Sequence, residues 1–244
     1  MTRDYDAEAK DAPEHRYAYG FDYRMHHYLL RSFAEFFASG NALELGCYHG
    51  HFTGLLLERF GQVHVVEASP ECVAEAARAV GGKAKFFQQR FEEFAPELPY
   101  DNIFLVHTLE HLDGRVEMLQ RIGSWLAPGG RLFVATPNAR AGSRQIAVKM
   151  GLIEHHAAVT PAELAHGHRV TYSLDTLAAD ISASGLRIRW QGGVFFKGLA
   201  NFQLDAALTA GIISEAYLDA CYELGKIHPD LCSSIYCVCE QPAA

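Results

Sequence analysis

A glycine turn that follows an acidic residue is the part of this sequence best suited to hold a small ligand. The run Glu44-Leu45-Gly46-Cys47-Tyr48-His49-Gly50 joins a short apolar strand, residues 42–45, to a helix expected over residues 51–60. Glycine tolerates positive φ and lets a ligand approach the backbone closely, and the free N–H groups of a helix start can bind polar atoms. The turn therefore predicts a ligand cradle at the carboxyl end of a first strand, where doubly wound sheets bind nucleotides. An ordinary tight strand–helix turn is the alternative.

The spacing of this turn excludes two common phosphate sites. It is E-x-G-x-x-x-G, which is not the G-x-G-x-x-G of dinucleotide-binding proteins, and no Gly-Lys-Ser/Thr phosphate loop follows. A second acid, Glu67, ends the next apolar strand over residues 63–66. A carboxylate at that position can accept hydrogen bonds from both ribose hydroxyls of a nucleoside. With the glycine turn in place, this interpretation is favoured over a solvated carboxylate at a strand end.

Four motifs in βαβ order resemble those of class I S-adenosylmethionine-dependent methyltransferases. They are the glycine turn, Glu67, the residues after a fourth strand, and the run Leu126-Ala127-Pro128-Gly129-Gly130-Arg131-Leu132. The resemblance is good over residues 41–138 and loose elsewhere. Leu109-Glu110-His111 and Thr136-Pro137-Asn138 are similar to the branch of quinone-biosynthesis O-methyltransferases and many sugar or natural-product methyltransferases.

The resemblance implies S-adenosylmethionine as the cofactor and assigns its site. In the family the acid at Glu67 binds the ribose, and the segment after the third strand contacts adenine, although Arg90 stands about where the family usually has an acid. Aromatic rings can hold the sulfonium cation by cation–π attraction, and Tyr19, Phe21 and Tyr48 are candidates. The expected cofactor-binding residues are Glu44, Gly46, Tyr48, Gly50, Glu67, Ala68, Arg90, Phe91, His107 and Tyr19.

Methyl transfer mainly requires alignment of the nucleophile, the methyl group and sulfur, but a hydroxyl nucleophile also needs a base. Histidine has a suitable pKa. His111 matches a histidine of the quinone-type branch and is the first candidate, with His168 and His26 in reserve. A solvent-facing residue at a helix start is the alternative for His111. An amine acceptor would need no strong base. The expected substrate-binding residues are Asn138, His166 and Tyr172.

Histidines are frequent between residues 139 and 172, where His155 and His156 precede His166 and His168. Such spacings can ligate zinc or iron, or the imidazoles can form a polar wall facing the substrate. No carboxylate or thiol motif completes a ligand set, so no metal is expected.

The predicted acceptor is a small polar metabolite with a hydroxyl or amine, such as a sugar or natural-product intermediate. The Asn/Asp-Pro-Pro-aromatic motif of base amino-methyltransferases is absent after the fourth strand. Two other functions stay open. One is an enzyme that consumes S-adenosylmethionine without an acceptor, for which a closed pocket and orientation of the methionyl amine by Asn138 and Tyr172 would be expected. The other is a non-catalytic module that binds S-adenosylmethionine.

The elements that must position these residues predict an α/β fold. We expect a single domain over residues 1–244, with a doubly wound, mostly parallel, seven-stranded Rossmann-like sheet and helices on both faces. In the family the last two strands form an antiparallel hairpin at the sheet edge. Strands are expected at 42–45, 63–66, 84–88, 101–106, 131–136, 186–190 and 235–240, a turn at 128–130, and helices at 51–60, 70–80, 114–127, 174–184 and 206–224.

Three further segments surround this expected sheet. Residues 1–14 are charged and aperiodic, which predicts a mobile arm. Residues 16–37 are rich in aromatics and become an amphipathic helix from residue 24, which suits either a lid over the cofactor or plain packing on the sheet. Residues 139–172 and 192–233 are expected to be cap insertions, and the helix in the second is expected either to roof the substrate site or to mediate a homodimer.

Composition limits the partners. The chain has 244 residues, 49% of them hydrophobic, a formal net charge of −8 and no apolar run of membrane-spanning length. Without a Lys/Arg cluster, nucleic acid is an unsuitable partner, and no membrane association is expected. The six cysteines form no C-x-x-C pair, which favours free buried thiols in a reducing compartment. We therefore expect a cytoplasmic protein with a small-molecule substrate and possible homodimerisation.

Overall fold

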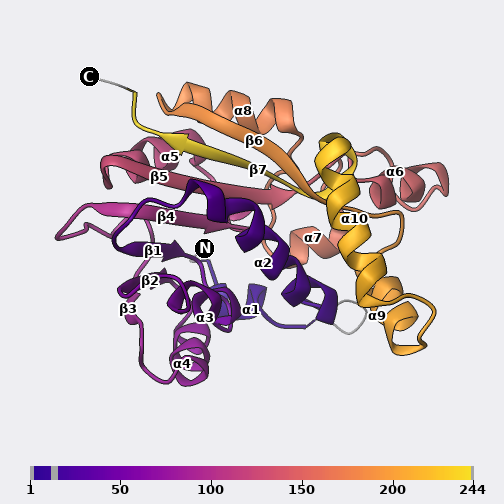
Figure 1. Ribbon diagram of the computed structural model, residues 1–244, viewed down its shortest axis with the longest axis horizontal. Helices are drawn as coiled ribbons and strands as arrows, with labels where there is room; N and C mark the ends of the chain where they lie inside the picture. The colour runs from indigo at the N-terminus through magenta and orange to yellow at the C-terminus, as the bar shows by residue number, and fades with distance from the viewer. Residues whose placement is uncertain (1–2, 12–15, 243–244) are drawn as a thin grey trace.

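A seven-stranded sheet forms the centre of the computed structural model, which describes residues 3–11 and 16–242 (Figure 1). The strand order is β3-β2-β1-β4-β5-β7-β6, and β7 runs antiparallel to the other six strands. This confirms the predicted doubly wound, mostly parallel sheet and its antiparallel edge hairpin. The strands are β1 (Ala42–Leu45), β2 (Val63–Glu67), β3 (Lys85–Gln88), β4 (Tyr100–Val106), β5 (Leu126–Pro137), β6 (Arg187–Phe196) and β7 (Cys232–Glu240).

Helices cover both faces of the sheet, as predicted, because successive strand residues point to opposite sides. In β5, Phe133 and Ala135 join the core beneath α2, α3, α4 and α10, whereas Leu132 and Val134 join the core beneath α5 and α8. These helices are α2 (Gly20–Phe33), α3 (His51–Leu57), α4 (Pro70–Ala79), α5 (Arg115–Gly123), α8 (Leu174–Ala183) and α10 (Glu215–Ile227). The shorter ones are α1 (Tyr5–Glu8), α6 (Gly142–Lys149), α7 (Pro161–Ala165), α9 (Asn201–Thr209), η1 (Ala34–Phe36), η2 (Leu109–His111) and η3 (Pro229–Leu231).

The fifth strand begins earlier than predicted. The expected helix over 114–127 ends at Gly123, and the expected turn at 128–130 lies within β5. The pairing of Tyr100 with Leu126 starts the strand, and a register shift between Tyr100 and Asn102 accommodates the Pro-Gly-Gly run. The local turn signal is therefore overridden by pairing with β4.

The second cap also differs from the prediction of one helix over residues 206–224. It contains two helices, α9 and α10, and Ser214 caps the second by accepting a hydrogen bond from the Tyr217 N–H at 3.4 Å. The sixth strand extends to Phe196, so this cap starts later than residue 192. The first cap contains α6 and α7.

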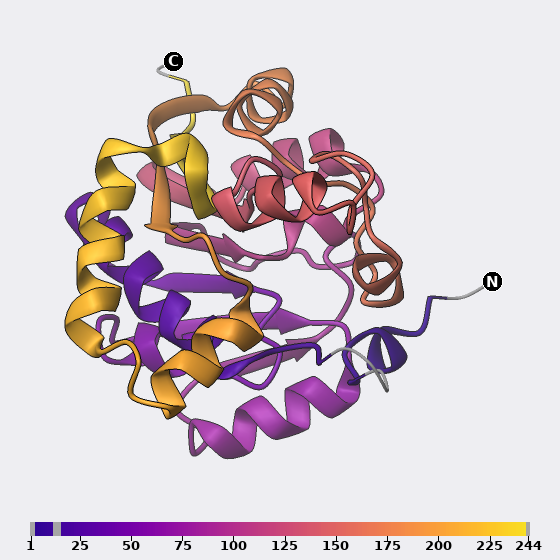
Figure 2. The ribbon, with the colours of Figure 1, turned by 90° about the vertical axis from the view of Figure 1, so that its right-hand side faces the viewer.

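The N-terminal segment is structured where it is described, which differs from the mobile arm predicted for residues 1–14. Residues 1–2 and 12–14 of that prediction lie outside the described residues. Asp4 caps α1, and α1 lies beside α4 (Figure 2), where Asp6 accepts a hydrogen bond from the Ser69 hydroxyl. Lys10 pairs with Glu71 at 3.2 Å. Charged residues therefore fasten this segment to the sheet domain despite its lack of apolar periodicity.

Candidate active site

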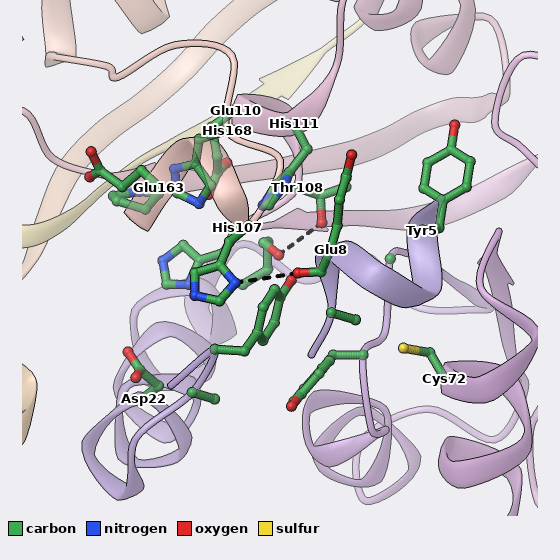
Figure 3. Close-up of a pocket in the computed structure, with 18 of the residues that line it drawn as sticks. Tyr5, Glu8, Asp22, Cys72, His107, Thr108, Glu110, His111, Glu163 and His168 are labelled. Atoms are coloured by element: carbon green, nitrogen blue, oxygen red, sulfur yellow. Dashed lines mark hydrogen bonds between the residues drawn. The ribbon is translucent and has the colours of Figure 1, made fainter. Parts of the chain in front are cut away.

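A cavity of about 1120 Å³ opens at the carboxyl ends of β1, β2 and β4 (Figure 3). Its walls come from four parts of the chain: the N-terminal segment with the start of α2, the strand ends, the first cap and α9. Ligand sites of doubly wound sheets lie at this edge, where the strand order reverses between β1 and β4. The fold therefore places the predicted glycine turn and the end of β2 at one site.

The two glycines of the β1–α3 turn serve different purposes. Both have φ of +81°. Gly46 lines the cavity, and a Cβ there would lie 2.7 Å from the Thr108 Oγ1. Gly50 is not among the lining residues; a Cβ on it would meet the Ala76 Cα at 2.8 Å. The predicted cofactor role of Gly50 is thus not supported, because this glycine allows α3 and α4 to approach each other.

Two non-glycine residues at this edge also have left-handed backbone. Tyr48 has φ of +47° in the β1–α3 turn, and His107 has φ of +49° directly after β4. Both line the cavity. Such conformations are costly for residues with a Cβ and are found most often at ligand sites. The strain at both strand ends agrees with their assignment to a binding site.

Glu44 brings a buried carboxyl group to the cavity wall from the middle of the sheet. Its side chain accepts a hydrogen bond from the Thr53 hydroxyl at 2.5 Å, and the residue is 2% exposed. Burial raises its pKa to about 8, against the smaller opposing effect of the Thr53 hydrogen bond. A cationic group in the cavity would favour the ionised form.

Glu67 holds the turn together from the end of β2. One carboxylate oxygen accepts the Cys47 N–H at 3.1 Å, and the other accepts the Ser69 N–H at 2.9 Å. Burial raises its pKa, while the backbone hydrogen bonds act in the opposite direction. The residue lines the cavity, where a carboxylate can accept hydrogen bonds from a ligand. Ala68, next in the chain, also lines the cavity.

The predicted adenine-binding segment also reaches the cavity. Phe91 and Arg90 both line it, and Phe91 packs partly against the core beneath α5. The Arg90 guanidinium pairs with Glu92 at 3.3 Å and is half exposed. This arrangement puts an aromatic side chain and a cation on this part of the cavity wall.

Aromatic residues of the N-terminal segment cover the cavity. The Tyr17 ring stacks on Tyr48 with 4.5 Å between centroids, and Tyr19 and Tyr23 also line the cavity. Phe21 does not: it is fully buried in the core, with the Lys197 ammonium 5.2 Å from its ring. The segment therefore both covers the cavity and packs on the sheet, and Phe21 is not placed to contact a ligand cation.

Five histidines of the described residues line the cavity, His166 among them. The Nδ1 atoms of His26 and His51 are 3.0 Å apart, and burial lowers the pKa of His26. The Nε2 of His107 lies 2.9 Å from the Ser234 hydroxyl, and burial lowers the His107 pKa to about 4. The other two, His111 and His168, face each other with ring centroids 4.5 Å apart. His111 is therefore not the solvent-facing residue considered as an alternative.

Two predicted substrate-binding residues lie away from the cavity. The Asn138 amide donates to the main-chain oxygens of Asp230 and Cys232, both at 2.8 Å, and thereby fastens β5 to the start of β7. The Tyr172 hydroxyl donates to Asp180 at 2.7 Å within the core beneath α8. Neither is among the residues that line the cavity, and both side chains make hydrogen bonds within the fold. His166, the third prediction, does line the cavity.

The sequence prediction did not include several acidic residues that line the cavity, and Glu110 is the most buried of those near the histidines. Glu110 lies between Leu109 and His111 in the η2 turn after β4, and it lines the cavity. Its carboxyl group lies beside His111 and His168, with ligand atoms of the three residues all within 4.8 Å of one another. Its adjacency to His111 was the only available signal, because His168 comes from a distant part of the chain.

Known methyltransferases match this chain in sequence. A family model described as a methyltransferase domain matches residues 15–190. A trans-aconitate 2-methyltransferase of Methylobacterium nodulans is 35% identical over 103 residues, which cover 41% of this chain and 40% of that protein. A ubiquinone biosynthesis O-methyltransferase of Xanthomonas euvesicatoria is 29% identical over 169 residues, covering 67% of this chain and 70% of that protein. The match to the trans-aconitate enzyme thus spans well under half of its length.

Solved structures share the fold. The N-methyltransferase NodS of Bradyrhizobium japonicum, in complex with S-adenosyl-L-homocysteine, superposes with a TM-score of 0.58 at 16% identity, covering 92% of this chain and 89% of that one. The glycopeptide N-methyltransferase MtfA, complexed with S-adenosyl-L-methionine, gives a TM-score of 0.57 at 17% identity, with coverages of 87% and 86%. At these identities the likeness shows a common architecture.

Proposed function

Because this chain belongs to the class I S-adenosylmethionine-dependent methyltransferase family, we propose that it transfers the methyl group of S-adenosylmethionine to a hydroxyl or amine of a small polar metabolite. The size of the cavity is the observation that carries this proposal. Sites for drug-sized ligands occupy about 300–1,000 Å³, and this cavity has about 1120 Å³. It therefore has room for a nucleoside cofactor and a second small molecule together.

The residues at the strand ends fit this cofactor. Glu67 lines the cavity, and its carboxylate can accept hydrogen bonds from the ribose hydroxyls in addition to those from the Cys47 and Ser69 N–H groups. Phe91 offers a face for the adenine ring, and Glu44 offers a buried carboxyl group to the cationic methionine end. Tyr19 and Tyr48 offer ring faces to the sulfonium. When bound, the cofactor supplies an electrophilic methyl group on sulfur.

The histidines provide a base for a hydroxyl acceptor. His111 lies on the cavity wall after β4, and burial lowers its pKa, so its ring is neutral near pH 7 and has a free lone pair for a proton. The same burial makes it a weaker base than an exposed histidine. His168 faces it and is the second candidate, and His26 on the opposite wall is the third. An amine acceptor would use the same cavity with its own lone pair. His166 remains the proposed substrate contact.

The similar proteins support a small acceptor. Two of the similar proteins are a trans-aconitate 2-methyltransferase and a ubiquinone biosynthesis O-methyltransferase. No helix in residues 3–11 and 16–242 is long and apolar enough to cross a membrane. The six cysteines are free and buried, in keeping with the cytoplasmic location that we propose. A homodimer remains a prediction.

The structure gives little support to a reaction of the cofactor without an acceptor. An enzyme of that kind is expected to have a closed cavity with no space beyond the methyl group, and this cavity is larger. The two residues expected to orient the methionyl amine, Asn138 and Tyr172, do not line it. Acceptor-dependent transfer is therefore the favoured interpretation.

Product analysis tests the proposal. Purified protein is incubated with S-adenosylmethionine alone and then with a small-molecule extract. The expected result is S-adenosylhomocysteine only when the extract is present. Formation of methylthioadenosine without extract would overturn the proposal and indicate an enzyme that acts on its own cofactor. Binding without any product would indicate a non-catalytic module.

The same preparation tests the cofactor site. Glu67→Ala should weaken S-adenosylhomocysteine binding at least about tenfold, since buried ribose hydroxyls lose a charged acceptor. Glu58→Gln is the matched control, because Glu58 is an exposed acid at the end of α3. Isothermal titration calorimetry gives both dissociation constants, and circular dichroism establishes that the variant is folded. An unchanged constant for folded Glu67→Ala would remove this residue from the site.

A further inference from the structure

We propose that Glu110, His111 and His168 form a binding site for a divalent transition-metal ion on the wall of the cavity. The ligand atoms of the three side chains lie within 4.8 Å of one another. Figure 3 shows the three side chains gathered on one side of the cavity, and all three residues line it. This replaces the expectation, drawn from the sequence, that no metal is bound.

The buried carboxyl group of Glu110 is the strongest evidence that a metal ion binds at this position. The residue is 1% exposed, and neither of its carboxyl oxygens has a hydrogen-bond partner in any other described residue. Burying such a group without a partner is costly, and proteins normally pair it, protonate it or use it to bind a metal. The nearby cations do not pair with it, because Arg3 binds Glu8 at 2.6 Å and Arg144 binds Glu163 at 2.6 Å.

The main chain orients one of the two imidazoles. The His111 ring has a hydrogen bond to the main chain of His166. Metal-bound histidines commonly use one ring nitrogen in this way, since the contact fixes the orientation of the other.

The fold holds the three ligands together from two distant segments. Glu110 and His111 belong to the η2 turn after β4, and His168 belongs to the end of the first cap. The Arg169 N–H donates to the Glu110 main-chain oxygen at 2.8 Å, which joins the two segments beside the site. On the other side, the Arg3 guanidinium donates to the His111 main-chain oxygen at 2.7 Å. The backbone around the cluster is thus fixed.

The chemistry of the set selects the class of ion. Two imidazoles and one carboxylate suit zinc or ferrous iron and leave open positions for a further ligand. A tetrahedral ion with bonds of about 2.1 Å would hold its ligand atoms about 3.4 Å apart. The side chains therefore need to close from their present spacing by rotation about side-chain bonds. Magnesium, which prefers oxygen ligands, fits this set poorly.

An ion at this position would give the site a second means of activating the acceptor. A divalent ion bound to a hydroxyl oxygen lowers the pKa of that hydroxyl and orients it. This role rests on the proposed methyl transfer. The existence of the ion site does not, because metal binding can be measured without cofactor or acceptor.

Metal binding to the full-length chain tests the proposal. Chelator-treated protein is dialysed against Zn²⁺ or Mg²⁺, and retained metal is measured by inductively coupled plasma mass spectrometry. We expect one equivalent of Zn²⁺ and no stoichiometric Mg²⁺. Glu110→Gln and His168→Ala should each weaken Zn²⁺ binding more than about tenfold, because even loss of a partner to a ligand has effects of 10–100-fold. His155→Ala is the matched control, since His155 is an exposed histidine of the same cap.

Two outcomes would overturn the site. One is absence of stoichiometric Zn²⁺ in the unmodified protein, which would leave Glu110 as a neutral carboxylic acid beside two histidines. The other is equal Zn²⁺ affinity in Glu110→Gln, His168→Ala and the unmodified protein. Circular dichroism melting identifies a variant that fails to fold, and the other ligand variant then decides. Retained S-adenosylhomocysteine binding together with absent Zn²⁺ binding would refute the metal site alone.

Discussion

Replacing Glu44 by glutamine should stabilise the ligand-free protein at neutral pH. The Glu44 carboxyl is fully enclosed and has a pKa of about 8, against an ordinary value of 4.5. At pH 7 the unfolded chain releases this proton and the folded protein retains it. Keeping the Glu44 carboxyl protonated in the folded protein at pH 7 therefore lowers the free energy of unfolding by about 3 kcal/mol, at about 1.4 kcal/mol per pH unit above 4.5. Glutamine keeps the size of the side chain and its ability to accept from Thr53 without this cost.

The pH dependence gives this prediction its direction. Between pH 4.5 and pH 8 the folded protein binds more protons at Glu44 than the unfolded chain does, so this group makes stability fall as pH rises. The variant lacks that contribution. Below pH 4.5 the two proteins should differ little, and at pH 7 Glu44→Gln should be more stable by about 3 kcal/mol, or roughly 6–12 °C in Tm.

Urea unfolding of both proteins at pH 5 and pH 7.5 measures this difference. Other titrating groups are common to both proteins, so they cancel when the two free energies of unfolding are subtracted. A difference that is the same at both pH values would show that Glu44 does not carry a raised pKa, and the reasoning would fail. If Glu44 holds the cationic end of the cofactor, the variant should also bind S-adenosylmethionine more weakly while being more stable.

Three other substitutions test the site and its support. Gly46→Val places a branched side chain at positive φ on the cavity wall and should abolish S-adenosylhomocysteine binding by calorimetry; normal binding would mean that the cradle lies elsewhere. Gly50→Ala should instead lower the free energy of unfolding by about 1–3 kcal/mol, because its new Cβ would meet α4. The folded variant should bind S-adenosylhomocysteine with unchanged affinity. A loss of affinity without a loss of stability would contradict this. Lys197 is buried with a pKa lowered by burial to about 8 from 10.5, so between these values the unfolded chain binds more protons and stability from this group rises with pH. The free energy of unfolding of the unmodified protein minus that of Lys197→Met should therefore rise by about 3 kcal/mol between pH 8 and pH 10.5. If this difference is the same at both pH values, the pKa of Lys197 is not lowered.

The central sheet was predictable because its signals are local. Apolar runs of four to seven residues alternate with helical patterns, and Ser69 and Pro70 mark the start of α4 in the sequence itself. The element bounds were wrong where pairing with another strand or a helix-capping residue determines them. The Pro-Gly-Gly run joins β5 because β4 pairs with it, and one expected helix becomes α9 and α10 where Ser214 starts the second.

The cofactor half of the site was also accessible from sequence, since its residues follow the ends of adjacent parallel strands. Gly46 and Glu67 reach the cavity for this reason alone. Gly50 shows the limit of the argument, because a glycine needed for helix packing has the same local signature as one needed for a ligand. Asn138 shows the same limit. It follows a strand end at the edge of the sheet where the cavity lies, but its amide donates to a main-chain oxygen at the start of β7 instead of facing a ligand.

The acceptor half depends on contacts between distant segments, and no local pattern encodes them. The sequence shows Glu110 beside His111 and His168 fifty-seven residues later by numbering, without indicating that the Arg169 N–H joins the two segments. Such contacts between the segments place the Glu110 carboxyl group beside the histidine-rich cap. A buried acid without a hydrogen-bond partner is likewise visible only in three dimensions. The histidines of this cavity therefore have to be judged together with Glu110, as bases for proton transfer if no ion is bound and as metal ligands if one is.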